Sequence, residues 1–267
     1  MNYSKNLRKK HLTNSMDNLI AVENIYMNLG FLIIAVLIGI HSFEVFTNLI
    51  AIFIAMLGFL VLFTALIKEN YSRGEGFALT GIAFGISSVF YLSIVCLNLD
   101  QNFNYDTAAK LVLASGYFQG LGILLSVIFA NKKVKTKKFF YLFLSGVVIL
   151  QAIIHYVQPT IFFLYAENKF TILKNVSDLG LLLFYAIILV IVFFKRKYLI
   201  LDKNRICLFF IISNLLASVG STVFLNLSSI MYLICQLMAL LSYTLLYSIL
   251  ANNKIKKPMA EIYNQMD

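Results

Sequence analysis

Eight long apolar segments follow one another along this chain of 267 residues, with only short polar connectors between them. Each is close to the roughly 20 residues that a helix needs to cross a hydrocarbon core of about 30 Å. The segments are continuous, whereas the strands of a membrane barrel alternate between apolar and polar residues. We therefore predict an all-α fold, a polytopic integral membrane bundle of about eight transmembrane helices. The predicted spans are Ile25–Ile40, Val45–Ile67, Gly76–Leu97, Thr107–Ala130, Phe139–Tyr156, Val176–Phe194, Ile206–Phe224 and Ser229–Leu250.

The composition excludes most classes of soluble protein. Hydrophobic residues make up 60% of the chain and charged residues 13%, whereas a soluble domain is about half apolar and about a quarter charged. So few charges cannot cover a protein surface in water. We therefore expect a multi-pass protein of the cell membrane with lipid as its main partner.

The net charge of the chain is +10, which in a soluble protein would suggest a nucleic-acid partner. Here no basic stretch is long or mixed with stacking aromatics, and we expect no nucleic-acid partner.

The basic residues are distributed unevenly over the two sides that eight spans would create. Of the 22 Lys and Arg residues, only Lys110, Lys169 and Lys174 fall on one side, and all the others fall on the opposite side. Basic connectors remain in the cytoplasm because their translocation is disfavoured. One missed helix would destroy this alternation, so the sequence predicts that both termini are cytoplasmic.

A single membrane domain accounts for nearly the whole chain. We expect a basic cytoplasmic tail over residues 1–24, the membrane domain over 25–250 and a short cytoplasmic tail over 251–267. The longest connector is outward-facing and carries Pro159, which predicts that the fifth helix ends near Tyr156. No connector is long enough to form a soluble domain.

Three ionisable side chains are the candidate ligand contacts. His41 and Glu44 lie three positions apart at the junction of the first two spans, which places them on one face if helix continues there. His155 lies at the outer end of the fifth span. Such a set could bind a proton, a polar ligand or a metal ion. The alternative is that these side chains only face the lipid headgroups, and the sequence identifies no metal or cofactor.

Four further polar residues lie inside predicted spans, and each has a structural interpretation. Asp178 opens the sixth span, where an acid complements the helix dipole and Asn175 or Ser177 could cap the helix. Buried amides in membrane helices usually form hydrogen bonds between helices. We interpret the remaining three residues in this way: Gln119, Asn214 and Gln236.

Two pairs of glycines have the spacing that allows membrane helices to approach closely. Gly81 and Gly85 lie in the third predicted span, and Gly116 and Gly120 lie in the fourth. The simplest prediction is that these two spans pack against each other through the glycines.

Four stretches of the chain resemble the MASE3 family, a membrane-associated sensor module of bacterial and archaeal histidine kinases and diguanylate cyclases. The resemblance implies an eight-helix sensor followed by a cytoplasmic signalling domain, and it extends over about residues 25–260. The stretches are the His41–Glu44 junction followed by Val45–Leu66, Gly81–Phe84 at the start of the third span, Thr171–Asp178, which is similar to the family's Thr-x-x-Lys-x-x-Ser-Glu motif, and Ser242–Tyr243 with Tyr247 before Lys257–Pro258.

This chain departs from the family pattern at several polar positions. Where the family has an acidic residue and a His in the third span, Tyr91 and Ile94 stand here. Where the fourth span has Trp, Arg and Glu, this chain has Val112, Gly116 and Gln119. The Gly-His pair of the last span is also missing near Cys235. These departures imply a diverged sensor, and we also expect it to have no attached output domain.

The sequence favours a sensory or regulatory membrane module that relays an unknown signal to a cytoplasmic histidine kinase or cyclase. A homodimer is compatible with this reading. One alternative is a small transporter or channel, whose polar path Ser213, Asn214, Thr222 and Gln236 could line. Another is an intramembrane enzyme acting on lipid. We predict no enzymatic activity, because the sequence has no phosphate-binding glycine loop, HExxH motif or nucleophile elbow.

Overall fold

The chain divides into two units, Met1–Phe46 and Thr47–Asp267, and the helical bundle belongs to the second. The first predicted span, Ile25–Ile40, and His41 lie outside the residues that the structure describes. The structure is a computed structural model that describes residues 43–67, 75–99, 105–129, 135–156, 164–166, 169–195, 204–223 and 230–251.

Seven helices form in the described part of the chain, and each corresponds to one predicted span with ends within four residues of the prediction. Two strands of two residues each lie between the fifth and sixth spans. The elements are α2 (Phe43–Leu66), α3 (Glu75–Leu99), α4 (Tyr105–Ile128), α5 (Thr136–Tyr156), β1 (Tyr165–Ala166), β2 (Lys169–Phe170), α6 (Ile172–Lys195), α7 (Asn204–Val223) and α8 (Ile230–Ala251).

Six of these helices are long and apolar enough to cross a membrane. They are α2, α3, α4, α5, α6 and α8, whereas α7 contributes the shorter apolar stretch Phe210–Ser221 in the described residues. Helix α5 ends at Tyr156, as the sequence predicted. Helix α6 begins at Ile172, four residues before the predicted span, because Lys174 and Asn175 interrupt the apolar run at its start.

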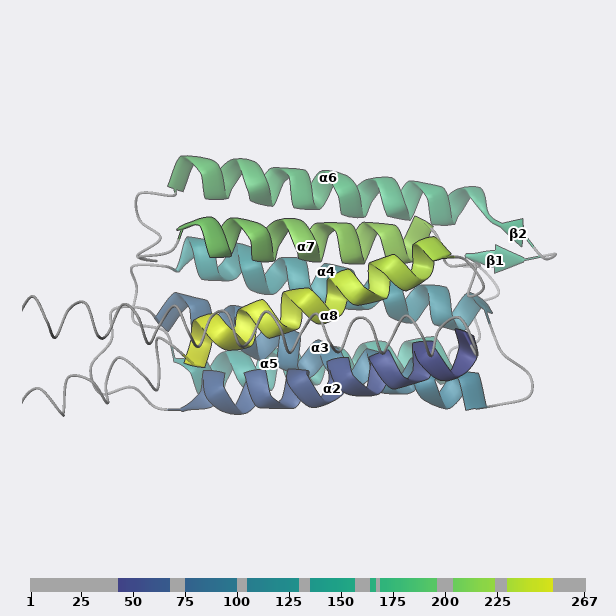
Figure 1. Cartoon of the computed structure of the whole chain (residues 1–267), viewed down its shortest axis with the longest axis horizontal. Coiled ribbons are helices and arrows are strands. Elements are labelled where there is room, and N and C mark those ends of the chain that lie inside the picture. Colours follow the sequence, from purple (N-terminus) through teal and green to yellow (C-terminus); the bar gives the residue numbers. More distant parts are fainter. Residues whose placement is uncertain are drawn as a thin grey trace, which may run out of the picture. The chain divides into compact units, whose positions relative to one another are not determined.

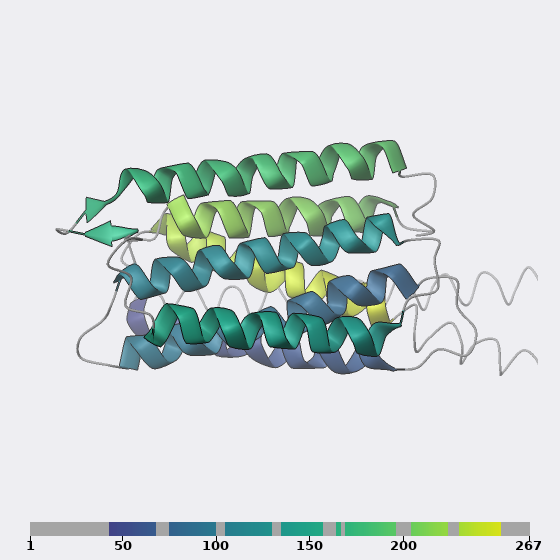
Figure 2. The same cartoon turned by 180° about the vertical axis from the view of Figure 1, so that it is seen from behind.

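The helices run side by side along one direction, with α8 crossing its neighbours obliquely (Figure 1). Helices α3 and α4 pack closely together at the centre, α6 and α7 lie beyond α4, and α5 lies beside α3 (Figures 1 and 2). Of the 18-residue apolar stretch in α3, 78% is buried inside the protein, whereas only 11% of the corresponding stretch in α5 is buried. Most residues of α5 are therefore exposed or half-buried at the surface of the described bundle.

The glycine pairs lie at close helix contacts, but not at the contact that we predicted. A Cβ atom on Gly81 would lie 2.7 Å from the Cβ of Ala65 on α2, and one on Gly85 would lie 2.9 Å from the carbonyl oxygen of Gly58 on α2. The pair on α4 faces away from α3. Its nearest neighbours are Leu181 and Ser218 for Gly116, and Phe184 and Ile188 for Gly120.

A different glycine serves the contact between α3 and α4. A Cβ atom on Gly122 would collide with the Cβ of Ala83 on α3. The prediction that the two spaced pairs face each other was therefore wrong. Spacing along one helix identifies a face that tolerates close approach, but it does not identify the helix that approaches.

The two short strands form an antiparallel hairpin in which Tyr165 pairs with Phe170 and Ala166 pairs with Lys169. The prediction of an all-α fold did not include this hairpin. The backbone N–H of Leu164, just before β1, donates a hydrogen bond to Oδ1 of Asp106 in the first turn of α4 (2.6 Å). This bond fastens the connector between α5 and α6 to the end of α4.

Candidate functional site

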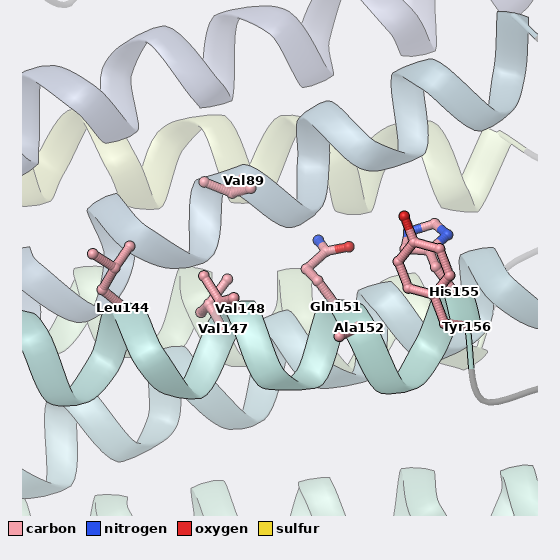
Figure 3. A pocket seen from close by; sticks show the side chains of 8 residues that line it. All are labelled: Val89, Leu144, Val147, Val148, Gln151, Ala152, His155 and Tyr156. Atoms are coloured by element: carbon pink, nitrogen blue, oxygen red, sulfur yellow. The ribbon is translucent and has the colours of Figure 1, made fainter.

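Of the three predicted ligand contacts, only His155 has a described side chain. It is exposed in the last turn of α5 and lines a groove beside Tyr156 and Gln151 (Figure 3). Glu44 lies at the start of α2, but its side chain, like His41, lies outside the described part. Whether the three groups meet therefore stays a prediction. Among the described residues, no three His, Cys, Asp or Glu side chains are placed to hold a metal ion.

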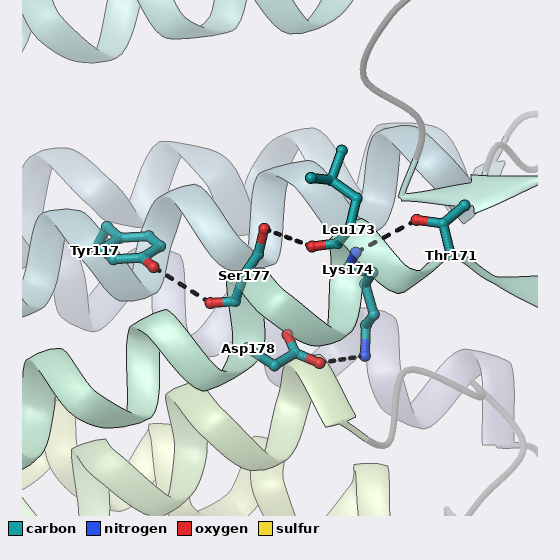
Figure 4. Close-up of polar contacts among 6 residues, drawn as sticks. All are labelled: Tyr117, Thr171, Leu173, Lys174, Ser177 and Asp178. Carbon is teal, nitrogen blue, oxygen red and sulfur yellow. Dashed lines mark hydrogen bonds and ion pairs between the residues drawn. The ribbon is translucent and has the colours of Figure 1, made fainter.

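The start of α6 carries a cluster of polar contacts, which we call the α6 cluster. It consists of Thr171, which directly precedes α6, of Lys174, Ser177 and Asp178 in α6, and of Tyr117 in α4. The hydroxyl of Thr171 caps α6 by accepting a hydrogen bond from the backbone N–H of Lys174 (3.3 Å). The hydroxyl of Tyr117 donates to the backbone oxygen of Ser177 (3.2 Å), as Figure 4 shows. The cluster thus joins the end of the hairpin connector to the middle of α4.

An ion pair lies at the centre of the α6 cluster. Nζ of Lys174 is 2.7 Å from Oδ2 of Asp178, and their side chains are 4% and 10% exposed. The cap is Thr171, and Asp178 lies in the second turn of α6. The interpretation of Asp178 as an acid at the helix start, capped by Asn175 or Ser177, was therefore wrong.

Helix stability does not account for this ion pair. The order with the cation first opposes the helix dipole and is the less favourable one. Burial of both charges offsets most of their attraction. Within the described structure, Oδ1 of Asp178 is also buried without a hydrogen-bond partner. Charged groups at membrane depth are functional candidates for these reasons.

A second ion pair lies at the same end of the bundle. Lys110 and Asp106 of α4 form a close pair with side chains 9% and 14% exposed. Its order, with the acid first, favours the helix dipole. Asp106 also accepts the hydrogen bond from Leu164, so this pair holds the connector between α5 and α6. In the pair of α6, by contrast, Oδ1 of Asp178 has no hydrogen-bond partner in the described structure.

Deeper in the bundle, Tyr185 of α6 joins three helices. Its side chain is fully buried, and its hydroxyl donates to the backbone oxygen of Gly116 in α4 (3.1 Å). The amide nitrogen of Asn214 in α7 donates to the same hydroxyl (2.6 Å), and Oγ of Ser218 lies 3.3 Å away. Asp178 and Tyr185 are seven residues apart, two helical turns, so both lie on the buried face of α6.

A second tyrosine, Tyr243 of α8, has the same role on the other side of α4. Its hydroxyl donates to the backbone oxygen of Phe84 in α3 (3.0 Å) and accepts from Nε2 of Gln119 in α4 (3.2 Å). The ring of Tyr91 on α3 packs edge-on against the ring of Tyr243, with ring centroids 6.2 Å apart. Gln119 also donates to Ser115 (3.0 Å).

The predicted polar residues thus have different environments. Gln119 and Asn214 both make hydrogen bonds between helices through the two tyrosines. Gln236 is buried, and in the described residues its amide oxygen has no hydrogen-bond partner. The sequence analysis missed Tyr185, because nothing in the local sequence distinguishes it from the other tyrosines of the chain. It included Tyr243 in a stretch that resembles the family, but it did not predict that this hydroxyl joins α8 to α3 and α4.

The long apolar helices and the ion pairs buried at one end define a multi-pass helical membrane protein. Its family follows from comparison with family models. The chain belongs to the MASE3 family of membrane-associated sensor domains, whose model matches residues 25–258, nearly the whole chain. Searches of curated proteins and of solved structures gave no match.

Proposed function

We propose that this protein is an eight-span sensor with both termini in the cytoplasm. It detects a signal at its outer end and relays it through α8 to a cytoplasmic histidine kinase or cyclase. In this proposal residues 1–24 and 251–267 are cytoplasmic tails, and His41, Glu44 and His155 contact the signal. The distribution of Lys and Arg supports the topology, and the family supports the sensory role.

The hydrogen bonds that join α6 to α4, and α4 to α8, are the observation on which the relay rests. The cluster is fixed to α4 through Tyr117 and lies two turns from Tyr185. Tyr185 connects α6 to α4 and α7, and Gln119 connects α4 to Tyr243 of α8. A change at the outer end of α6 can therefore bias α8 through the hydrogen bonds that join α6 to α4 and α4 to α8.

The positions at which this chain differs from the family pattern also bear on the proposal. Tyr91 and Gln119 replace ionisable groups of the family pattern. Here Tyr91 packs against the ring of Tyr243, and Gln119 forms a neutral hydrogen-bonded network with Ser115 and the hydroxyl of Tyr243. Such a network can rearrange without moving a charge through the membrane. We infer that the diverged positions retain the coupling between helices and alter the signal.

The contacts of two residues weigh against the transporter alternative. Asn214 donates to Tyr185, and the hydroxyl of Ser213 donates to the backbone oxygen of Phe210 (3.0 Å). Both residues would have to leave these partners to line a polar path.

To test the relay, the full chain is fused after Asp267 to a diguanylate cyclase domain, and cyclic di-GMP is measured in cells at equal protein levels. Asp178→Asn removes the ion pair of the α6 cluster, and we expect at least a threefold change in product. The matched control is Asn175→Asp, an exposed position on the same helix. Equal output from the parent and Asp178→Asn, with both proteins folded, would exclude the cluster from the relay.

The topology has its own test. In a background without native cysteines, single cysteines replace Ile172 at the start of α6 and Lys135 before α5, both exposed. A membrane-impermeant maleimide should label position 172 in intact cells, and position 135 only after permeabilisation. Labelling of position 135 in intact cells, and of position 172 only after permeabilisation, would show that the proposed topology is inverted.

A further inference from the structure

A groove of about 640 Å³ lies between α5 and α3 in the described part of the bundle. One wall is a single face of α5 with Leu144, Val148, Gln151 and His155, and the other includes Val89 of α3 (Figure 3). The surrounding surface of α5 is apolar and exposed, so in a bilayer the groove opens into hydrocarbon.

The two ends of the groove differ in polarity. From Leu144 to Val148 its lining is aliphatic, whereas Gln151, His155 and Tyr156 gather at the end remote from the lysines of α5. Leu144 and His155 are 11 residues apart, which corresponds to about 16 Å of helix at about 1.5 Å per residue. This length is about half of the ~30 Å hydrocarbon core, the depth of one leaflet.

Two polar groups at this end lack a partner within the described part of the chain. Nε2 of Gln151 donates to the hydroxyl of Ser93 on α3 (2.9 Å), but its amide oxygen accepts nothing there. Figure 3 shows this oxygen on the side of Gln151 towards His155. The His155 imidazole likewise has no hydrogen-bond partner among the described residues. Unpaired polar groups are costly at membrane depth, so a hydrogen-bonding occupant would stabilise this end.

We propose that the groove binds one hydrocarbon chain of an outer-leaflet lipid with a hydroxyl-bearing headgroup. The chain lies along Leu144–Val148, and a headgroup hydroxyl donates to the amide oxygen of Gln151 while His155 bonds to the same headgroup. This inference deepens the proposed function by giving the signal at His155 a chemical class, and in that respect it rests on the proposed function.

The test measures lipid contact directly. The full chain is reconstituted in nanodiscs with a trace of monoacylglycerol that carries a diazirine in its acyl chain. After illumination, adducts are mapped by mass spectrometry. We expect adducts on residues 144–152 of α5, with a tenfold loss in Val148→Trp, which fills the groove. Ile149→Trp is the matched control, because Val148 and Ile149 are both 59% exposed but only Val148 lines the groove.

A second comparison isolates the headgroup. Gln151→Leu combined with His155→Ala should reduce labelling by the monoacylglycerol threefold to tenfold and leave labelling by a diazirine alkane of the same length unchanged. Equal labelling of Val148→Trp and Ile149→Trp would mean ordinary lipid at the surface and would overturn the proposal. Cross-links from position 148 to a second copy or to residues 25–40 in place of lipid would also overturn it. If specific adducts form but the monoacylglycerol does not change the output of the cyclase fusion, the result would support lipid binding in the groove and count against the sensing function.

Discussion

Replacing Tyr185 by Phe removes one buried hydroxyl from the junction of three helices and leaves the ring in place. The hydroxyl bonds to the backbone oxygen of Gly116 and to Asn214, and lies within reach of Ser218. Hydrogen bonds between membrane helices contribute about 0.6 kcal/mol on average and about 1.7 kcal/mol at most. Loss of all three should therefore lower the free energy of unfolding by about 2 kcal/mol.

The assay is reversible unfolding in mixed micelles, with SDS as the denaturant. Tyr141→Phe is the matched control, because Tyr141 is 66% exposed on α5 and should show no change. A double-mutant cycle with Asn214→Ala isolates the shortest of the three contacts, and we expect a coupling free energy of about 1 kcal/mol. If Tyr185→Phe matched Tyr141→Phe and the cycle were additive, the hydroxyl would not join α6 to α7.

Two further predictions concern stability. Asp178→Asn removes the carboxylate that lies beside the buried ammonium of Lys174, and it should cost about 3 kcal/mol in the same unfolding assay. Asp178→Leu with Lys174→Met should recover most of that loss, and failure of the double variant to recover stability would contradict this account. Gly85→Ala places a methyl group 2.9 Å from the Gly58 backbone oxygen and should cost about 1–3 kcal/mol, more than Gly146→Ala, whose nearest neighbour is a ring atom 3.1 Å away that can move; equal losses would argue against close packing of α2 on α3.

The positions of the helices could be predicted because lipid imposes a minimum length on every apolar segment. Six of the seven described helices meet this requirement, whereas α7 has only the shorter apolar stretch Phe210–Ser221. The start of α6 could not be predicted in this way, since it depends on the cap that Thr171 provides and on polar contacts in its first turns. The spacing of Lys174 and Asp178 is that of helical neighbours, so their ion pair could have been predicted from the sequence.

The central contacts are of another kind. Tyr243 donates to a backbone oxygen that lies 159 positions earlier in the chain, and Tyr185 to one 69 positions earlier. Backbone oxygens are the same at every residue, so the sequence holds no signal for such a pairing. The partners of the spaced glycines could not be predicted for the same reason.

The bonds of Tyr243 to α3 and α4 also limit the ways in which α8 can move. Rotation about its own axis would carry the hydroxyl away from both partners, whereas a tilt centred on this residue would keep them. Eight residues separate Tyr243 from the helix end at Ala251, a lever arm of about 12 Å. A tilt of about 10° would therefore displace that end by about 2 Å, while the fulcrum inside the bilayer stays in place.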